Sequence, residues 1–142
     1  MHENPPNSVL KKILFEAKNI ALVGASSDSN RPSYAIMHRL QSVGYRVIPV
    51  NPNEVNILGE KVYSSLLDIP KTIPIDIVNV FRRSEYTLSI AHDTASIKAK
   101  TLWLQSGVYN EDTAFYAQSQ GLIVIMDLCI AVEYSLLIKS PL

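Results

Sequence analysis

Five short, mostly apolar runs recur along the chain, and each is followed by a turn or a polar loop. The runs span residues 20–23, 47–50, 75–81, 101–104 and 122–126. The first run, residues 20–23, is apolar throughout, which is typical of strands buried on both faces, as in parallel sheets. Because segments with helical spacing separate most of these runs, the pattern predicts an α/β fold with a parallel sheet.

Local signals predict where the helices begin and end. Pro32 suits the first position of a helix, and Gly44 suits the residue that follows its end. Asn110 predicts another helix start, because its side chain can cap the first free amide groups. Further helices are expected from Ser84 to about Ala95, over residues 130–138, and after a Ser8 cap near the N-terminus. The resulting fold class is a doubly wound, Rossmann-like, mostly parallel five-stranded sheet with helices on both faces.

Two segments depart from this regular alternation. Pro49 lies inside the second apolar run and has no amide hydrogen to donate, so regular pairing along that whole strand is not expected. Residues 53–74 replace the expected helix with a longer connection, in which residues 66–70 predict one helical turn.

Composition narrows the classes of function. The chain has 142 residues, 47% of them hydrophobic, and its formal net charge is zero, which predicts one domain over residues 1–142 with a loose tail at 1–7. This balance argues against a nucleic-acid or membrane-surface partner. Cys129 is the only cysteine, and no secretory signal or membrane span is evident, so we expect a cytoplasmic protein. A homo-oligomer stays open.

The loops at the carboxyl ends of the predicted strands are the expected ligand sites of such a sheet. The first, Gly24-Ala25-Ser26, precedes a helix whose free amide groups suit a phosphate, and Arg31 adds a positive charge near the helix start. Only the first glycine of the dinucleotide fingerprint is present. A strand, turn and helix with one glycine also occurs where nothing binds, and this alternative is about equally open.

The later loops carry further candidates. Asn51-Pro52 ends the second strand where NAD enzymes usually have a carboxylate, although Asn-Pro is also simply a good turn. Phe81-Arg82-Arg83 ends the third strand; paired arginines can grip phosphate, and surface charge is the alternative explanation. Gln105 and Gly107 follow the fourth strand and predict a neutral, hydrogen-bonding wall.

Catalytic groups are scarce at these strand ends. His2, His38 and His92 fall on the tail and on predicted helices, and no nucleophile elbow, Walker lysine or metal-ligand spacing is present. Cys129 could be a reactive thiol, but a buried and inert cysteine is the more common case. The pattern therefore favours binding over catalysis.

In their order along the chain, these motifs resemble the small bacterial CoA-binding proteins with a Rossmann fold. The resemblance spans about residues 20–133 and extends to the CoA-binding domains of succinyl-CoA synthetase alpha subunits and ADP-forming acyl-CoA synthetases. It rests on the runs Val23-Gly24-Ala25-Ser26, Arg31-Pro32-Ser33-Tyr34, Gly44 to Pro52, Ile57-Leu58-Gly59, Val62-Tyr63, Asp68-Ile69-Pro70, Asp76-Ile77-Val78, Val80 to Arg83, Leu102 to Gly107 and Met126 to Cys129.

The resemblance implies coenzyme A or an acyl-CoA as the ligand. It places the diphosphate on the loop Gly24 to Ser26 with Arg31 nearby, and the adenosine end along Asn51-Pro52 and Phe81-Arg82-Arg83. It directs the pantetheine arm toward Gln105 and Cys129. Where the family often has basic residues or a histidine, this chain has the neutral residues Leu128, Ala131 and Tyr134.

Two other functions stay open from the sequence. One is an NAD(P)-dependent or other nucleotide-dependent enzyme or redox sensor. The other is a subunit of a split acyl-CoA synthetase, which would require a catalytic histidine and an ATP-grasp partner.

Overall fold

A five-stranded parallel sheet forms the centre of the molecule. The computed structural model describes residues 1–138. The strands are β1 (Asn19–Val23), β2 (Arg46–Val50), β5 (Ile77–Val80), β6 (Thr101–Leu104) and β7 (Ile123–Ile125). Their order across the sheet is β2-β1-β5-β6-β7, and every pairing is parallel. The predicted fold class is therefore confirmed.

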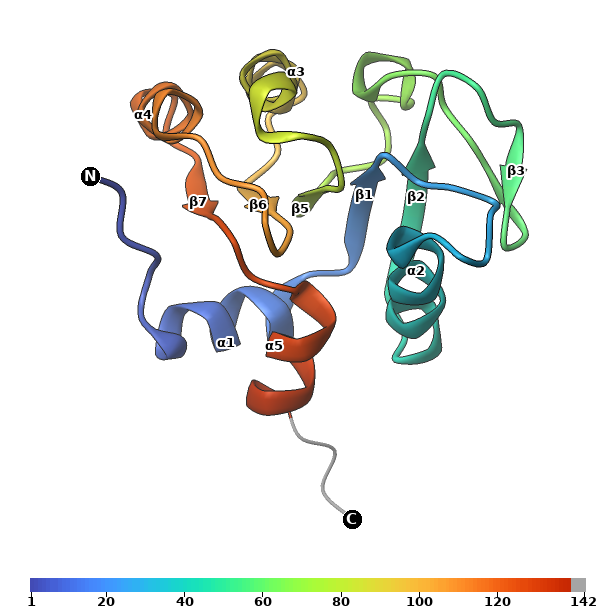
Figure 1. The fold of residues 1–142 in the computed structure, drawn as a ribbon, viewed down its shortest axis with the longest axis horizontal. Coiled ribbons are helices and arrows are strands. Elements are labelled where there is room, and N and C mark those ends of the chain that lie inside the picture. The colour runs from blue at the N-terminus through green and yellow to red at the C-terminus, as the bar shows by residue number, and fades with distance from the viewer. Residues whose placement is uncertain (139–142) are drawn as a thin grey trace.

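Helices cover both faces of this sheet (Figure 1). One face carries α1 (Asn7–Glu16), α2 (Pro32–Ser42) and α5 (Ile130–Leu137), and the other carries α3 (Thr87–Ser96) and α4 (Glu111–Ser119). Alternate strand residues feed two separate cores, since side chains of a strand point to opposite faces. Leu22, Ile77 and Trp103 are buried on the α1–α2–α5 side, and Val78 and Leu102 on the other side.

The helix starts were predicted with mixed success. Pro32 opens α2 and Asn110 caps α4, accepting hydrogen bonds from the amides of Asp112 and Thr113, as expected. The Ser8 cap is wrong, because α1 already begins at Asn7 and follows Pro6. The helix expected from Ser84 begins as a short 3₁₀ turn, η2 (Ser84–Tyr86), and becomes α3 only at Thr87.

The expectation for Pro49 is also wrong. β2 pairs with β1 over its full length, with Leu22 opposite Pro49. β2 is the edge strand of the sheet, and the Pro49 carbonyl points outward, where it accepts a hydrogen bond from the Tyr63 amide at 3.1 Å. Because the amide and carbonyl of one residue face the same side of a parallel strand, the missing Pro49 amide costs no bond to β1.

The long connection after β2 forms a small hairpin of its own. β3 (Asn56–Ile57) and β4 (Glu60–Lys61) pair antiparallel, and the sequence did not predict them. The helical turn expected near residues 66–70 is present as the 3₁₀ helix η1 (Leu66–Asp68).

The N-terminal segment, expected to be loose over residues 1–7, makes specific contacts in the structure. The Asn4 side chain donates to the Met126 carbonyl and accepts from the Met126 amide, both at 2.8 Å. The backbone amide of His2 donates to the Glu111 carboxylate at 2.7 Å. These partners lie more than 100 residues away in the chain, so no local sequence signal reveals them.

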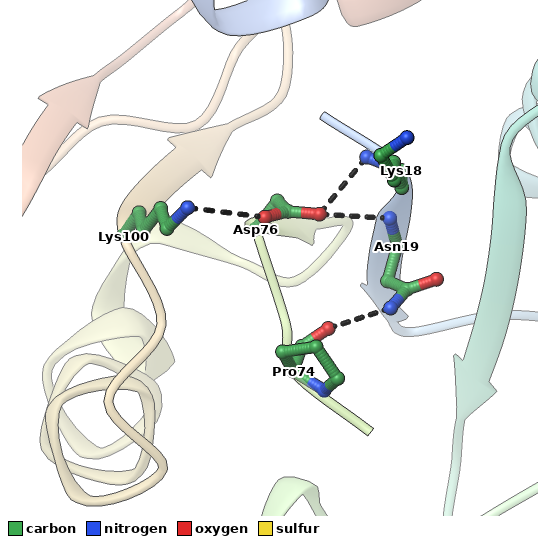
Figure 2. Close-up of polar contacts among 5 residues, drawn as sticks. All are labelled: Lys18, Asn19, Pro74, Asp76 and Lys100. Carbon is green, nitrogen blue, oxygen red and sulfur yellow. Dashed lines mark hydrogen bonds and ion pairs between the residues drawn. The ribbon is translucent and has the colours of Figure 1, made fainter. Parts of the chain in front are cut away.

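The amino ends of the central strands converge on the Asp76 carboxylate (Figure 2). Its Oδ2 accepts from the backbone amides of Lys18 at 2.9 Å and Asn19 at 3.0 Å. Its Oδ1 lies 3.6 Å from the Lys100 ammonium, and the Asn19 side chain donates to the Pro74 carbonyl at 2.8 Å. Three consecutive strands of the sheet order are thus tied together at this edge.

Within residues 1–138, no helix is both long and apolar enough to cross a membrane.

Candidate functional site

Two adjoining clefts lie at the carboxyl ends of the strands. The chain runs outward from β1 to β2 and then returns past β1 to β5, so the crevice of the sheet falls at this reversal. The first cleft has a volume of about 690 Å³ and the second about 570 Å³. They share the lining residues Gly24, Arg31, Phe81, Arg82 and Arg83. The sequence-predicted residues are largely brought together here.

Gly24 is needed for a reason that the sequence did not reveal. Its φ is +87°, and a Cβ atom built on it would lie 2.4 Å from the Phe81 carbonyl oxygen. The backbones approach closely because the Phe81 amide donates to the Val23 carbonyl at 2.8 Å, which extends the β1–β5 ladder into the loops. The fold itself therefore requires glycine here, whether or not a pyrophosphate also passes.

The loop that follows is ordered by its own side chains. Ser26 Oγ accepts from the Asp28 amide at 3.0 Å, and Asp28 Oδ1 accepts from the Asn30 amide at 2.9 Å. Arg31 then stands at the cap position of α2, where no side chain accepts from the helix amides. Pro32 has no amide hydrogen and the Tyr34 amide donates to the Arg31 carbonyl at 3.0 Å, so this helix start offers an anion the Ser33 amide and the positive end of the helix dipole.

Glu54 is a site residue that sequence analysis missed. Its Oε2 accepts from the Ser27 amide at 2.8 Å and from Ser27 Oγ at 3.1 Å. These hydrogen bonds hold the pKa of the Glu54 carboxyl below its ordinary value. Glu54 lies four residues after the end of β2. The fold of this connection brings its carboxylate to Ser27, in the loop between β1 and α2.

Asn51 is engaged within the protein. Its Nδ2 donates to the Ala25 carbonyl at 2.7 Å, and its Oδ1 accepts from the Asn53 amide at 2.8 Å, which is a side-chain turn of the expected kind. Asn51 thus ties the end of β2 to the first loop. Position 51 has no carboxylate, but Glu54 and Asp93 both line the first cleft and bring carboxylates to it.

Positive charge nevertheless prevails in the first cleft. Three guanidinium groups, those of Arg31, Arg82 and Arg83, face the two carboxylates, an excess of one. None of the three forms an ion pair within the described residues 1–138, although Arg82 lies 5.1 Å from the centre of the Tyr86 ring. Unpaired guanidinium groups at the mouth of a cleft suit phosphate, which they can bind through two parallel hydrogen bonds.

The second cleft has a different character. Ser33 and Gln105 reach it as buried polar side chains, at 4% and 5% exposure, and Cys129 adds a partly buried thiol. Ser33 belongs to the run Arg31-Pro32-Ser33-Tyr34, one of those that carry the family resemblance, but it was not predicted as a site residue. Gly107 does not line either cleft; its amide donates to Asp127 Oδ1 at 2.6 Å.

The residues that depart from the family pattern also lie off the clefts. Leu128, Ala131 and Tyr134 are absent from both linings. The Leu128 carbonyl accepts from the Trp103 indole at 2.9 Å, and Tyr134 packs edge-on against Tyr45 at 5.7 Å between ring centres. The three histidines do not line either cleft; His92 stacks on Tyr116.

The sheet order and the crevice at its reversal define a Rossmann-type α/β domain. Comparison with known proteins goes further, because residues 18–135 match the family described as CoA binding domain. The chain belongs to this family, which confirms the resemblance seen in its motifs.

Relatives fall into two groups, whole-chain and partial. The uncharacterized protein YneT of Bacillus subtilis strain 168 is 42% identical over 133 residues, covering 94% of this chain and 97% of YneT. A solved structure of a hypothetical protein from Pyrococcus horikoshii OT3 superimposes with a TM-score of 0.90 at 34% identity, covering 98% of this chain and 100% of that one. The ADP-forming acetate–CoA ligase II of Archaeoglobus fulgidus is 39% identical over 69 residues, which are 47% of this chain and 10% of the ligase.

Proposed function

We propose that this protein binds coenzyme A or an acyl-CoA and holds its diphosphate at the loop Gly24 to Ser26 and the start of α2. The observation that carries the proposal is the row of unpaired guanidinium groups along the line where the two clefts meet. A diphosphate placed there would leave room for a nucleoside in one cleft and for a long uncharged arm in the other. Membership of the CoA binding domain family supports the same ligand.

The two clefts suit the two ends of such a ligand. The first is lined by Asn51-Pro52, Tyr86 and the arginines, which offer flat and cationic surfaces to an adenosine carrying a ribose phosphate. The second runs past Gln105 and Cys129, so the pantetheine arm would extend there. We propose binding without catalysis, because no histidine lines either cleft and no histidine or carboxylate lines the second cleft beside the Cys129 thiol to activate it.

One observation favours a second candidate, an NAD(P)-type nucleotide. Glu54 brings a carboxylate near the end of β2, the region where dinucleotide enzymes hold the ribose diol. In this structure, however, the Glu54 carboxylate accepts hydrogen bonds from Ser27. It would have to turn toward the nucleoside to bind a ribose diol or to repel a ribose phosphate.

Isothermal titration calorimetry with CoA, dephospho-CoA and NAD separates these readings. We expect saturable binding of CoA, weaker binding of dephospho-CoA, and a higher melting temperature in the presence of CoA, since a ligand selective for the folded state stabilises it. Saturation by NAD with no heat from CoA at millimolar concentration would overturn the proposal in favour of the dinucleotide.

The partial similarity to ADP-forming acetate–CoA ligases supports a third candidate function, a subunit of a split acyl-CoA synthetase. That role would need a partner that supplies the ATP-dependent chemistry. Acyl-CoA formation on mixing with such a partner, and its loss without this chain, would establish it in place of a role in binding alone.

A further inference from the structure

The second cleft contains two polar atoms that the protein leaves without a partner. Ser33, the second residue of α2, is 4% exposed, and its Oγ makes no hydrogen bond within residues 1–138. Gln105, one residue beyond β6, is 5% exposed, and its Nε2 likewise has no partner among those residues. Both residues line the same cleft. Both side chains are more than nine-tenths buried, and among the described residues only Asn79 Oδ1 is fully enclosed without a partner, so the open atoms of Ser33 and Gln105 are accessible from the cleft and can donate to a ligand there.

Hydrogen bonds from Ile130 and Asn79 fix the orientation of the Gln105 side-chain amide. The backbone amide of Ile130, which can only donate, contacts the Gln105 side chain at 3.3 Å, so the atom it meets must be the oxygen Oε1. Asn79 Nδ2 donates to the same oxygen at 3.3 Å. Because Gln105 Oε1 accepts from two protein donors, Gln105 Nε2 is the atom available to a ligand in the second cleft.

The Asn79 amide shows what this arrangement costs. Asn79 is fully buried in the middle of β5, and its Oδ1 has no hydrogen-bond partner among the residues that the structure describes. An unpaired buried carbonyl typically costs about 1–3 kcal/mol, so this amide is not explained by stability alone. Its contact with Gln105 gives it a role in holding the Nε2 donor in place.

The chemistry of the cleft selects the kind of group that would bind. Ser33 and Gln105 are uncharged donors, and much of the remaining lining is apolar: Pro32, Ile36, Phe81 and Val108. The arginines lie on the side shared with the first cleft. Neutral donors beside apolar side chains match a carbonyl oxygen, and the three arginines, which line both clefts, suit the phosphates of the proposed ligand where the clefts join.

We infer that the second cleft is a carbonyl-binding subsite, in which Ser33 Oγ and Gln105 Nε2 donate to a carbonyl oxygen on the uncharged arm of the ligand. This inference rests on the proposed binding of CoA or acyl-CoA. Two carbonyl sources share this chemistry, an amide of the pantetheine arm and the thioester of an acyl-CoA. Both residues are thus assigned to specificity for the arm and not for the nucleotide.

The test compares ligands that differ only in the arm. Calorimetry would measure 3′-phospho-ADP, which has no arm, CoA, which has the amides, and acetyl-CoA, which adds the thioester. The variants are Ser33→Ala, which removes the hydroxyl, and Gln105→Glu, which keeps an oxygen for Asn79 and Ile130 but removes the donor. Ser64→Ala is the matched control, because Ser64 lines the first cleft and its Oγ donates to Asp68 instead.

We expect Ser33→Ala and Gln105→Glu to weaken CoA about five-fold or more, the effect of one ordinary hydrogen bond, while the affinity for 3′-phospho-ADP stays within about two-fold. A larger loss for acetyl-CoA than for CoA would identify the thioester as the bound carbonyl, and an equal loss would identify a pantetheine amide. The Ser64→Ala variant should not change the ratio of the CoA and 3′-phospho-ADP affinities. Equal losses for all three ligands, or none, would overturn the inference while the proposed function stands.

Failure of the proposed function gives a different result. If the wild-type protein binds none of the three ligands, that proposal falls, and saturation-transfer NMR with pantetheine alone then decides the subsite. Transfer that is present in the wild type and lost in Ser33→Ala would support the second cleft by itself. No transfer would overturn both.

Discussion

The two edges of the same sheet treat polar groups in opposite ways. At the amino edge, Asp76 accepts two backbone amides and pairs with Lys100, so its charge is used within the protein. At the carboxyl edge, three arginines, Ser33 Oγ and Gln105 Nε2 line two clefts and form no ion pair or hydrogen bond in the described part of the chain. The difference teaches that one edge closes the fold and the other is left open to a ligand.

A pair of carboxylates makes the contrast specific. Asp76 and Glu54 both accept from backbone amides, but Asp76 has a side chain only 17% exposed and links β1, β5 and β6. Glu54 holds a single exposed loop residue, Ser27. Loss of the first should change stability, and loss of the second should change binding.

The largest expected effect comes from Gly24→Ala, at a position on the open edge where the Phe81 backbone leaves no room for a side chain. A methyl group would meet the Phe81 carbonyl at 2.4 Å while holding a positive φ, so we expect the free energy of unfolding to fall by about 3 kcal/mol or more. Urea denaturation measures it. Gly121→Ala is the control, because Gly121 has a similar φ of +84° but open space, and it should cost about 1 kcal/mol. Equal costs would show that the close approach to Phe81 relaxes freely.

Asp76→Ala tests the closed edge. It leaves the amides of Lys18 and Asn19 without their acceptor, and hydrogen bonds to a charged group predict a loss of about 2–3 kcal/mol in the free energy of unfolding. Lys100→Ala should cost below about 1 kcal/mol, because the lysine side chain is 78% exposed and its ion pair is screened. CoA affinity should stay the same in both variants. A drop in affinity with unchanged stability would break the division between the edges.

Arg31→Ala tests the open edge. Arg31 is exposed and has no ion-pair partner in the part of the chain that the structure describes, so its loss should leave stability unchanged. We expect CoA affinity, measured by calorimetry, to fall about ten-fold through the lost phosphate contact. Arg46→Ala removes the same charge from an exposed residue at the amino end of β2 and serves as the control. The same loss in both variants would mean that overall charge, and not the loop, determines binding.

Glu54→Gln should give the smallest change, and in the opposite direction. The carboxylate competes with a ligand phosphate for the Ser27 donors and repels it, so the neutral amide should raise CoA affinity about two- to three-fold. Calorimetry at low and high salt would show a smaller gain at high salt. Weaker binding in Glu54→Gln would assign Glu54 to shaping the loop for the ligand.

The sequence predicted most elements, because their signals are local. Short, mostly apolar runs marked all five strands of the sheet, and Pro32 and Asn110 marked two helix starts. Pro49 was misjudged because its cost depends on which side of the strand is paired, and that follows from the edge position of β2. The β3–β4 hairpin was missed because each strand has only two residues.

The site was predicted in part for a similar reason. Strand ends can be read from the chain, so the arginines, the first loop and Gln105 were found. Ser33 and Glu54 lie on a helix and in a long connection, where no strand-end rule applies, and Gly107 was selected by position although it faces Asp127 instead of a cleft.

By itself, the sequence determined the class of fold, the family and the polar composition of the loops, since apolar periodicity and ordered motifs are properties of the chain. Only the tertiary structure decided which polar groups form hydrogen bonds within the protein and which remain available to a ligand. Asn51 is used to tie two loops together, Glu54 lies on Ser27, and Ser33 and Gln105 are left facing one cleft. The physical reason is that a hydrogen bond depends on distance and direction between groups far apart in sequence, which the fold alone sets.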